Sequence, residues 1–193
     1  MPDRGRIVLN APNLVTLLRI VLIPLIVAVF YLPDAWLAPD GKNLAATAIF
    51  LVAAVTDWLD GWLARKLNQM SAFGAFFDPV ADKLVVIGAL VILLYLNRID
   101  MVVALIIIGR EIAISALREW MAQLGQAKSV AVAFLGKLKT TAQMIAIPLL
   151  LYEDELFGLD CHGLGTVLIY IAALLTVISM LYYLRRALPL MRG

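Results

Sequence analysis

The chain has few of the residues that cysteine chemistry, zinc binding or a soluble fold require. Cys161 is its only cysteine and His162 its only histidine, so an intrachain disulfide is excluded and zinc lacks its usual ligands. These two residues are neighbours in a segment with acidic residues nearby, which argues against a catalytic cysteine–histidine pair. Charged residues make up 16% of the 193 residues, whereas soluble domains carry about 25%. The formal net charge of +2 gives little information about partners.

Long apolar runs stand where a soluble protein would have charged residues. Hydrophobic residues make up 63% of the chain, and the mean hydropathy is +0.94. Each run is long enough to cross the hydrocarbon core of a bilayer as a helix, and its polarity does not alternate as in a barrel strand. The predicted fold is therefore all-α and integral to a membrane. Six spans are expected, near residues 14–33, 44–64, 79–97, 101–121, 130–151 and 163–184.

The organisation of the chain is simple. No internal repeat, low-complexity segment or linker divides it, so the prediction is one membrane-embedded domain over residues 1–193. The first apolar segment lacks the small-residue cleavage pattern of a signal peptide and is expected to be retained. Residues 1–12, with Arg4 and Arg6 beside apolar side chains, are predicted to form a short interfacial element.

Basic residues near the ends of the spans predict how the chain is oriented. Cytoplasmic loops carry an excess of Lys and Arg, so both termini are expected on the cytoplasmic side of the membrane. The opposite side receives only Lys42 and Arg98, together with most of the loop acids. The basic residues on the terminal side are Arg4, Arg6, Arg65, Lys66, Lys128, Arg185, Arg186 and Arg192.

Four aspartates at the ends of the second and third spans are the most informative residues. They stand in the pattern Asp57-x2-Asp60-Gly61-x2-Ala64-Arg65-x8-Gly74-x3-Asp78-x3-Asp82. Each pair is spaced three or four residues apart and so shares a helix face. The predicted orientation gathers all four carboxylates at the cytoplasmic side, where they would repel one another unless cations compensate them. The pattern therefore predicts an oxygen-rich site for Mg²⁺ or Mn²⁺, with enough carboxylates for two ions.

The residues around the aspartates predict a phosphate ligand. Gly61 and Gly74 leave room for a bulky ligand near the backbone, and Arg65 offers a bidentate cation. Metal ions, an arginine and glycines together suggest a diphosphate. The alternative is a set of buried ion pairs, such as Asp57 or Asp60 with Arg65. Locally, Pro79 is predicted to be the first residue of the third helix, with Asp78 as its N-cap.

A second polar set follows in the fourth and fifth spans. Arg110 and Arg118 are eight residues apart and so share a helix face, and Glu111 can offset one cation. Lys137 and Lys139 add positive charge at a depth where side chains must face a polar cavity or each other. The excess of cations predicts a bound phosphate. The alternative is internal Arg–Glu pairing, with the lysines reaching the interface.

The first span carries a polar stripe. Asn13, Thr16 and Arg19 recur every three residues on an otherwise apolar helix. Two interpretations are open: contact with the nucleotide or lipid phosphate of a ligand, or anchoring at the membrane interface.

From Asp57 to Asp82 the chain resembles the signature of the CDP-alcohol phosphatidyltransferases at every fixed position. The resemblance implies six transmembrane helices, two divalent metal ions and cleavage of a CDP-linked pyrophosphate. It also implies residue roles. Asp57, Asp60 and Asp78 would be metal ligands, Asp82 would be both a ligand and the general base, and Gly61, Arg65 and Ser71 would contact the CDP moiety.

Further stretches are similar to the phosphatidylglycerophosphate synthase branch of that family. They are Gly109-Arg110-Glu111-Ile112, Ser115-Ala116-Leu117-Arg118-Glu119-Trp120 and Gly136-Lys137-Leu138-Lys139-Thr140-Thr141-Ala142-Gln143. This branch implies transfer of a phosphatidyl group from CDP-diacylglycerol to sn-glycerol 3-phosphate, with release of CMP, by a homodimer. The cationic pocket would hold the phosphate of the acceptor.

Two rival functions remain open. The same enzyme type could use another alcohol, namely inositol phosphate, serine or phosphatidylglycerol, and charge alone does not separate glycerol 3-phosphate from inositol phosphate. A cation or anion transporter would also place acids and bases in membrane helices. A transporter would need polar residues along a whole crossing, however, and here the acids gather at one end of their helices.

Overall fold

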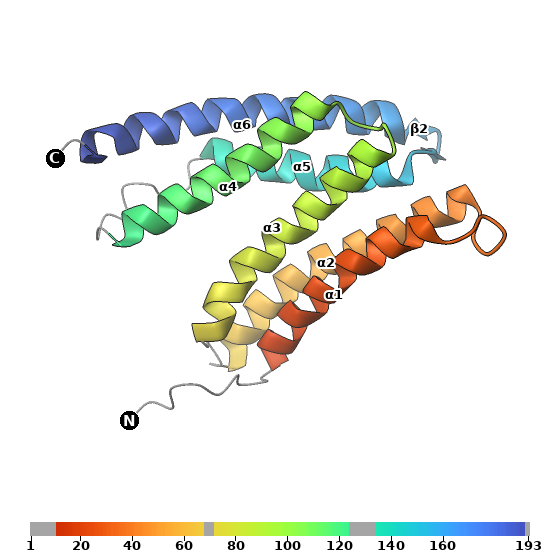
Figure 1. The fold of residues 1–193 in the computed structure, drawn as a ribbon, viewed down its shortest axis with the longest axis horizontal. Coiled ribbons are helices and arrows are strands. Elements are labelled where there is room, and N and C mark those ends of the chain that lie inside the picture. The colour runs from red at the N-terminus through yellow and green to blue at the C-terminus, as the bar shows by residue number, and fades with distance from the viewer. Residues whose placement is uncertain (1–10, 68–71, 124–133, 192–193) are drawn as a thin grey trace. The chain divides into compact units, whose positions relative to one another are not determined.

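The computed structural model describes residues 11–67, 72–123 and 134–191. In these ranges the chain forms six helices and one short antiparallel hairpin, so the predicted helical class is confirmed (Figure 1). The predicted interfacial segment lies outside the described residues, except for its last two, which begin the first helix. The elements are α1 (Ala11–Tyr31), α2 (Pro39–Leu67), α3 (Ala72–Tyr95), α4 (Met101–Gln123), α5 (Phe134–Tyr152), β1 (Glu155–Leu156), β2 (Leu159–Asp160) and α6 (Cys161–Met191).

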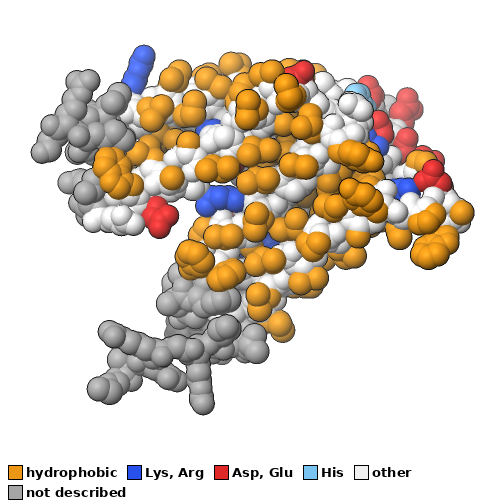
Figure 2. Space-filling model, in the orientation of Figure 1, with side chains coloured by type: hydrophobic (Ala, Val, Ile, Leu, Met, Phe, Trp, Pro, Cys, Tyr) orange, Lys and Arg blue, Asp and Glu red, His pale blue; other side chains and the backbone are white. Residues whose placement is uncertain are grey.

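Each predicted span coincides with a helix, but the helices differ in polarity. In the described chain, α1 over Asn13–Tyr31 and α6 over Cys161–Arg185 are long and apolar enough to cross a membrane. Helix α1 contains one charged residue, Arg19, whereas each of the other four helices contains at least two. Figure 2 shows hydrophobic side chains over most of the described surface that faces the viewer. The two apolar helices and this apolar surface indicate association with a membrane.

The chain divides into two compact units, Met1–Ile92 and Leu93–Gly193. In the first unit α1 packs against α2, and the core includes Ile26, Phe50 and Ala53. Helix α3 also approaches α1 closely, because a Cβ atom built on Gly88 would lie 3.0 Å from Cγ2 of Ile23. Small residues permit such close approach of helices when the surroundings are apolar. Helix α1 therefore contacts both of the helices that carry the aspartates.

In the second unit α6 packs along α5 and also against α4. Gly165 lies close to α5, since a Cβ atom there would lie 2.8 Å from Cγ of Leu150. Nearer the end of α6, Tyr183 joins a buried cluster with Ile114, Leu117 and Met121. The side chains of α4 that follow its charged middle are thus anchored on α6.

Arg98, in the loop between α3 and α4, caps the C-terminal end of α5. Its guanidinium donates hydrogen bonds to the carbonyl oxygens of Leu151, at 2.8 Å, and Leu150, at 3.1 Å, and it forms an ion pair with Glu153. The last carbonyls of a helix have no partner within the helix, so the guanidinium satisfies them. Burial lowers the pKa of Arg98 from its ordinary value, while Glu153 and Asp154 act in the opposite direction.

The start of α3 differs from the prediction. The helix begins at Ala72, so the prediction of Asp78 as N-cap and Pro79 as first residue is wrong. Pro79 lies inside the helix, where it has no N–H to donate to the carbonyl of Ala75. The residues before it are apolar and continue the helix, and the Asp78 side chain accepts a hydrogen bond from α1 instead of capping its own helix. An aspartate–proline pair is typical of a helix start, but here the contact of Asp78 with Thr16, which the sequence does not show, replaces the capping role.

Candidate functional site

The polar stripe of α1 faces the interior of the first unit. Asn13 is buried, and Thr16 and Arg19 are each only 1% exposed. Side chains that anchor a helix at an interface extend into the lipid headgroups, and these three do not. Burial of an arginine in an apolar setting is costly unless a partner offsets its charge.

The partners on α2 and α3 are two of the four aspartates. Nη1 of Arg19 donates to Oδ1 of Asp57 at 2.6 Å, and Oγ1 of Thr16 donates to Oδ1 of Asp78 at 2.6 Å. Thr16 and Arg19 are three residues apart, which is about 4.5 Å along a helix axis. Helix α1 therefore holds one carboxylate from α2 and one from α3 beside each other.

The other two predicted ligands follow from these by helical spacing. Asp60 stands three residues after Asp57 on α2, and Asp82 stands four residues after Asp78 on α3. Asp82 is exposed, whereas the side chain of Asp60 lies outside the described residues. The described side chains do not include that of Asp60. Among them, no three of His, Cys, Asp and Glu form a group that could hold a metal ion.

The chemistry of the donors fits a hard divalent cation. All the candidate ligands are carboxylates, the ligand type that Mg²⁺ and Mn²⁺ prefer. The Asp57 side chain is 49% exposed although its partner Arg19 is buried, so this carboxylate lies at the edge of the unit and not in its core. The predicted alternative, in which Arg65 pairs with the aspartates, concerns a side chain outside the described residues. Arg19 fills that role for Asp57.

The predicted contacts to a CDP moiety fall mostly outside the described side chains. Ser71 lies outside the described residues, and Gly61 and Arg65 lie on α2 with side-chain positions that are not described. Gly74, in the first turn of α3, is buried. Asn13 and Thr16 lie on the buried face of α1, where Thr16 bonds to Asp78.

A second polar cluster lies in the second unit, around Glu111 on α4. Its carboxylate forms ion pairs with Nζ of Lys139 on α5 and with Nη1 of Arg110, the latter at 3.4 Å. Lys139 is only 2% exposed and so does not reach the interface, whereas Lys137 is exposed. The internal pairing foreseen as an alternative is therefore present, with one carboxylate shared by two cations.

The two arginines of α4 meet at one tyrosine of α6. The guanidinium carbons of Arg110 and Arg118 lie 5.8 and 5.5 Å from the centroid of the Tyr183 ring, which confirms that the two share a helix face. Arg118 also donates to the Tyr183 hydroxyl at 3.2 Å, and Arg110 donates to Oγ of Ser179 at 3.4 Å. Tyr183 is 0% exposed. Tyr183 and Ser179 were not foreseen, because α6 reads as a uniformly apolar segment.

The cationic cluster retains donors that no described residue satisfies. Nε of Arg110 and Nε of Arg118 are buried and have no hydrogen-bond partner within residues 11–67, 72–123 and 134–191. Leaving a buried donor unsatisfied costs about 1–3 kcal/mol. A bound anion that accepted hydrogen bonds from both Nε atoms would satisfy them and would offset positive charge. The donor set therefore fits a phosphate.

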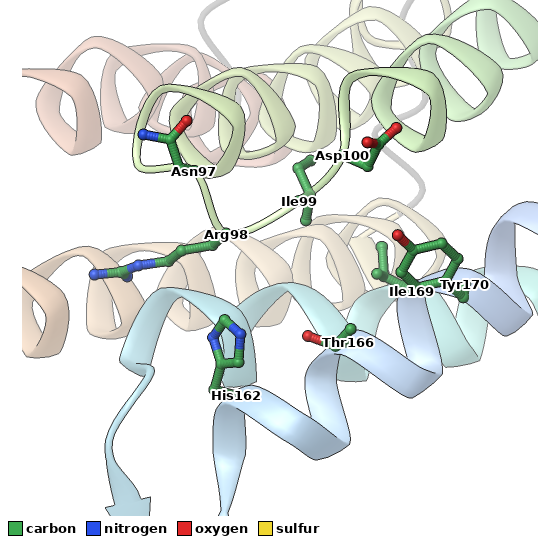
Figure 3. Close-up of a pocket in the computed structure, with 8 residues that line it drawn as sticks. All are labelled: Asn97, Arg98, Ile99, Asp100, His162, Thr166, Ile169 and Tyr170. Carbon is green, nitrogen blue, oxygen red and sulfur yellow. The ribbon is translucent and has the colours of Figure 1, made fainter.

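A pocket of about 310 Å³ lies elsewhere in the second unit, beside the loop that holds Arg98. Figure 3 shows His162 and Thr166 extending from α6 toward this loop, while the Arg98 side chain extends away from Thr166. None of the predicted site residues lines this pocket. Acidic side chains gather near it around the β1–β2 hairpin, close to His162 (Figure 2).

Comparison with known proteins assigns the family. The family model described as CDP-alcohol phosphatidyltransferase matches residues 9–178. Relatives from Shigella flexneri serotype 5b (strain 8401) and Escherichia coli (strain K12) are 51% identical over 180 residues, covering 92% of this chain and 94% of theirs. Both relatives are named CDP-diacylglycerol–glycerol-3-phosphate 3-phosphatidyltransferase. The chain thus belongs to the CDP-alcohol phosphatidyltransferase family, as the spacing of its four aspartates suggested.

Proposed function

We propose that the chain transfers the phosphatidyl group of CDP-diacylglycerol to sn-glycerol 3-phosphate, releasing CMP and leaving phosphatidylglycerophosphate in the membrane. The observation that carries this proposal is 51% identity, over nearly the whole length, to relatives named for this activity. The two polar clusters support it, since one suits a metal-bound diphosphate and the other a phosphate. The product would supply phosphatidylglycerol and cardiolipin synthesis.

The aspartate pattern would hold the metal ions. Members of this family generally depend on divalent metals, and the ligands would be Asp57, Asp60, Asp78 and Asp82. Bound Mg²⁺ or Mn²⁺, in two sites, would neutralise charge on the transferred and leaving oxygens. Around the ions, contacts to the CDP-lipid by Gly61, Arg65, Ser71, Gly74, Asn13 and Thr16 stay predictions.

The reaction requires one proton acceptor. The primary hydroxyl of glycerol 3-phosphate attacks the β-phosphorus and forms the new P–O bond, while the bond from this phosphorus to the bridging oxygen breaks and CMP leaves with its electrons. Asp82, exposed on α3, takes the proton of the attacking hydroxyl. Its neighbour Asp78, one turn earlier, stays bound to α1 through Thr16.

The acceptor phosphate would bind in the cationic cluster. Among the described side chains of this cluster, Arg110, Arg118 and Lys139 carry positive charge and Glu111 carries negative charge, and Lys137 is a further cation on the exposed side of α5. The two unsatisfied Nε atoms supply donors for its oxygens. Both guanidinium groups contact the Tyr183 ring, so one buried side chain of α6 holds the two arginines.

The membrane arrangement completes the proposal. Helices α1 and α6 satisfy the criteria for crossing by themselves, and α2, α3, α4 and α5 would cross with their polar side chains turned to protein or to a water-filled cavity. The chain would form one domain with both termini and the site on the cytoplasmic side of a bacterial inner membrane, and it would act as a homodimer. The basic residues near the termini support this orientation.

The acceptor assignment can be tested with detergent-purified protein, CDP-diacylglycerol and Mn²⁺. We expect CMP release with glycerol 3-phosphate and none with serine or glycerol, because the donor set matches a phosphorylated acceptor. We also expect none with inositol 1-phosphate, because the 51% identical relatives are named for glycerol 3-phosphate. A chelator should abolish the release. Release with another acceptor would retain the metal chemistry and refute the acceptor, and no release from folded protein would favour transport.

Arg118→Gln is expected to raise the KM for glycerol 3-phosphate about 10–100-fold, because it removes a charged donor worth about 1.5–3 kcal/mol. The KM for CDP-diacylglycerol should change little. Steady-state CMP release with each substrate varied in turn measures both constants. Arg185→Gln is the matched control, since Arg185 is exposed near the end of α6. A rise in the KM for CDP-diacylglycerol alone would refute the assignment of Arg118 to the acceptor.

A further inference from the structure

Two of the proposed metal ligands are each held by one oxygen only. Oδ1 of Asp57 accepts from Arg19 and Oδ1 of Asp78 accepts from Thr16, at 2.6 Å in both cases. In the described part of the chain, Oδ2 of neither aspartate has a hydrogen-bond partner. One oxygen of each carboxylate is thus fixed to α1, and the other is available to a ligand.

The donors are well placed to fix these carboxylates. Thr16 and Arg19 are almost fully buried on one face of α1, within a single helical turn of each other. Buried side chains in a packed helix have few alternative rotamers, so their donor atoms hardly move. A short hydrogen bond to Oδ1 therefore restricts where each carboxylate can lie.

The two donors, Thr16 and Arg19, also differ in charge. Arg19 is a cation, so its contact with Asp57 is an ion pair. Thr16 donates a neutral hydroxyl, so it adds no positive charge beside Asp78. Carboxylates that bind metals are commonly oriented by such hydrogen bonds from residues behind them, and loss of one costs about 10–100-fold in metal affinity.

We propose that Thr16 and Arg19 are positioning residues, which orient the carboxylates of Asp78 and Asp57 so that their Oδ2 atoms point toward a shared divalent cation site. The inference rests on the proposed metal site. The inference gives Thr16 and Arg19 a structural role. They bind no metal ion themselves, but they set the distance between the ligand from α2 and the ligand from α3.

The test measures Mn²⁺ binding to the full chain in detergent without substrate, by the loss of the electron paramagnetic resonance signal of free Mn²⁺. Thr16→Val removes the donor and keeps the shape, so we expect Mn²⁺ affinity to fall about 10–100-fold, whereas Thr16→Ser keeps the hydroxyl and should restore it. Arg19→Gln should act in the same direction, with partial rescue by Arg19→Lys. Thr47→Val is the matched control, because Thr47 is buried on α2 and bonds only to the carbonyl of Asn43.

The dependence of CMP release on Mn²⁺ concentration is a second measurement of the same effect. In Thr16→Val the Mn²⁺ concentration for half-maximal CMP release should rise, while saturating Mn²⁺ recovers most of the wild-type rate. A folding defect would instead lower the rate at every concentration of Mn²⁺, and that result would overturn the positioning role. Unchanged or tighter Mn²⁺ binding in both Thr16→Val and Arg19→Gln would also overturn it while sparing the metal site. A wild-type protein that binds no Mn²⁺ would overturn the metal site and the positioning role together.

Discussion

Asp82→Asn is expected to lower CMP release about 10²–10⁴-fold, the range that a general base contributes. An amide has nearly the same shape as the carboxylate but cannot accept the proton of the attacking hydroxyl. Asp82 is exposed on α3, so its replacement should leave the packing of the helix unchanged. Single-turnover CMP release with saturating glycerol 3-phosphate measures the chemical step, and titration with CDP-diacylglycerol measures binding. Binding should stay close to that of the wild type.

Asp40→Asn is the matched control, because Asp40 is an exposed aspartate in the first turn of α2 and far along that helix from Asp57. It should retain full turnover. If Asp82→Asn released CMP as fast as the wild type, Asp82 would not be the base. If it lost CDP-diacylglycerol binding as well, the carboxylate would serve mainly as a metal ligand.

Asp78→Asn should have an even larger effect. The amide can still accept the Thr16 hydrogen bond through its oxygen, but the atom that replaces Oδ2 becomes an NH₂ donor and no longer binds a cation. Loss of a single neutral donor to a developing charge costs about 10²–10³ in rate. A divalent ion carries more charge than such a donor, so we expect a loss of at least about 10³-fold.

The metal dependence distinguishes the two aspartates. In Asp78→Asn, Mn²⁺ binding should weaken and high Mn²⁺ should not restore full CMP release, whereas Asp82→Asn should keep at least one bound ion. Glu119→Gln is the control, since Glu119 is an exposed carboxylate near the end of α4. Wild-type Mn²⁺ affinity in Asp78→Asn would remove Asp78 from the ligand set.

The helices could be predicted from the sequence because long apolar runs determine both their number and their approximate position. Their boundaries could not. Asp78-Pro79 is a common start signal, yet α3 begins at Ala72, because apolar residues before the proline extend the helix and one missing hydrogen bond does not end it. The sequence also shows which residues carry charge within α2 to α5. Hydropathy alone, however, does not show which partners these charged side chains have.

The candidate site was likewise predictable only in part. Helical periodicity showed that Asn13, Thr16 and Arg19 share a face, but periodicity does not say what the face meets, and both interpretations looked outward to ligand or lipid. The structure turns the face inward to Asp57 and Asp78. For the arginines of α4 the shared face was foreseen correctly, whereas their neighbour on α6 was missed because a lone tyrosine in an apolar helix gives no signal.

The buried contacts of α1 have a consequence for how the chain enters the bilayer. A charged residue at the centre of an isolated helix costs about 2.5–3.5 kcal/mol during insertion. Helix α1 precedes the other described helices along the chain, and its stretch Asn13–Tyr31 is apolar enough to cross a membrane although it contains Arg19. If α2 and α3 also cross, as proposed, Arg19 would offer an ion pair to Asp57 as α2 inserts, and Thr16 would offer a hydrogen bond to Asp78 as α3 inserts.

Helices α4 and α5 need each other in the same way, since Glu111 on one pairs with Lys139 on the other. If α4 and α5 cross the membrane, as proposed, neither would enter lipid favourably without its partner, and the two would insert best as a hairpin before α6 packs against them. The polar groups that equip this chain for chemistry would thus also set the order in which its helices assemble during synthesis.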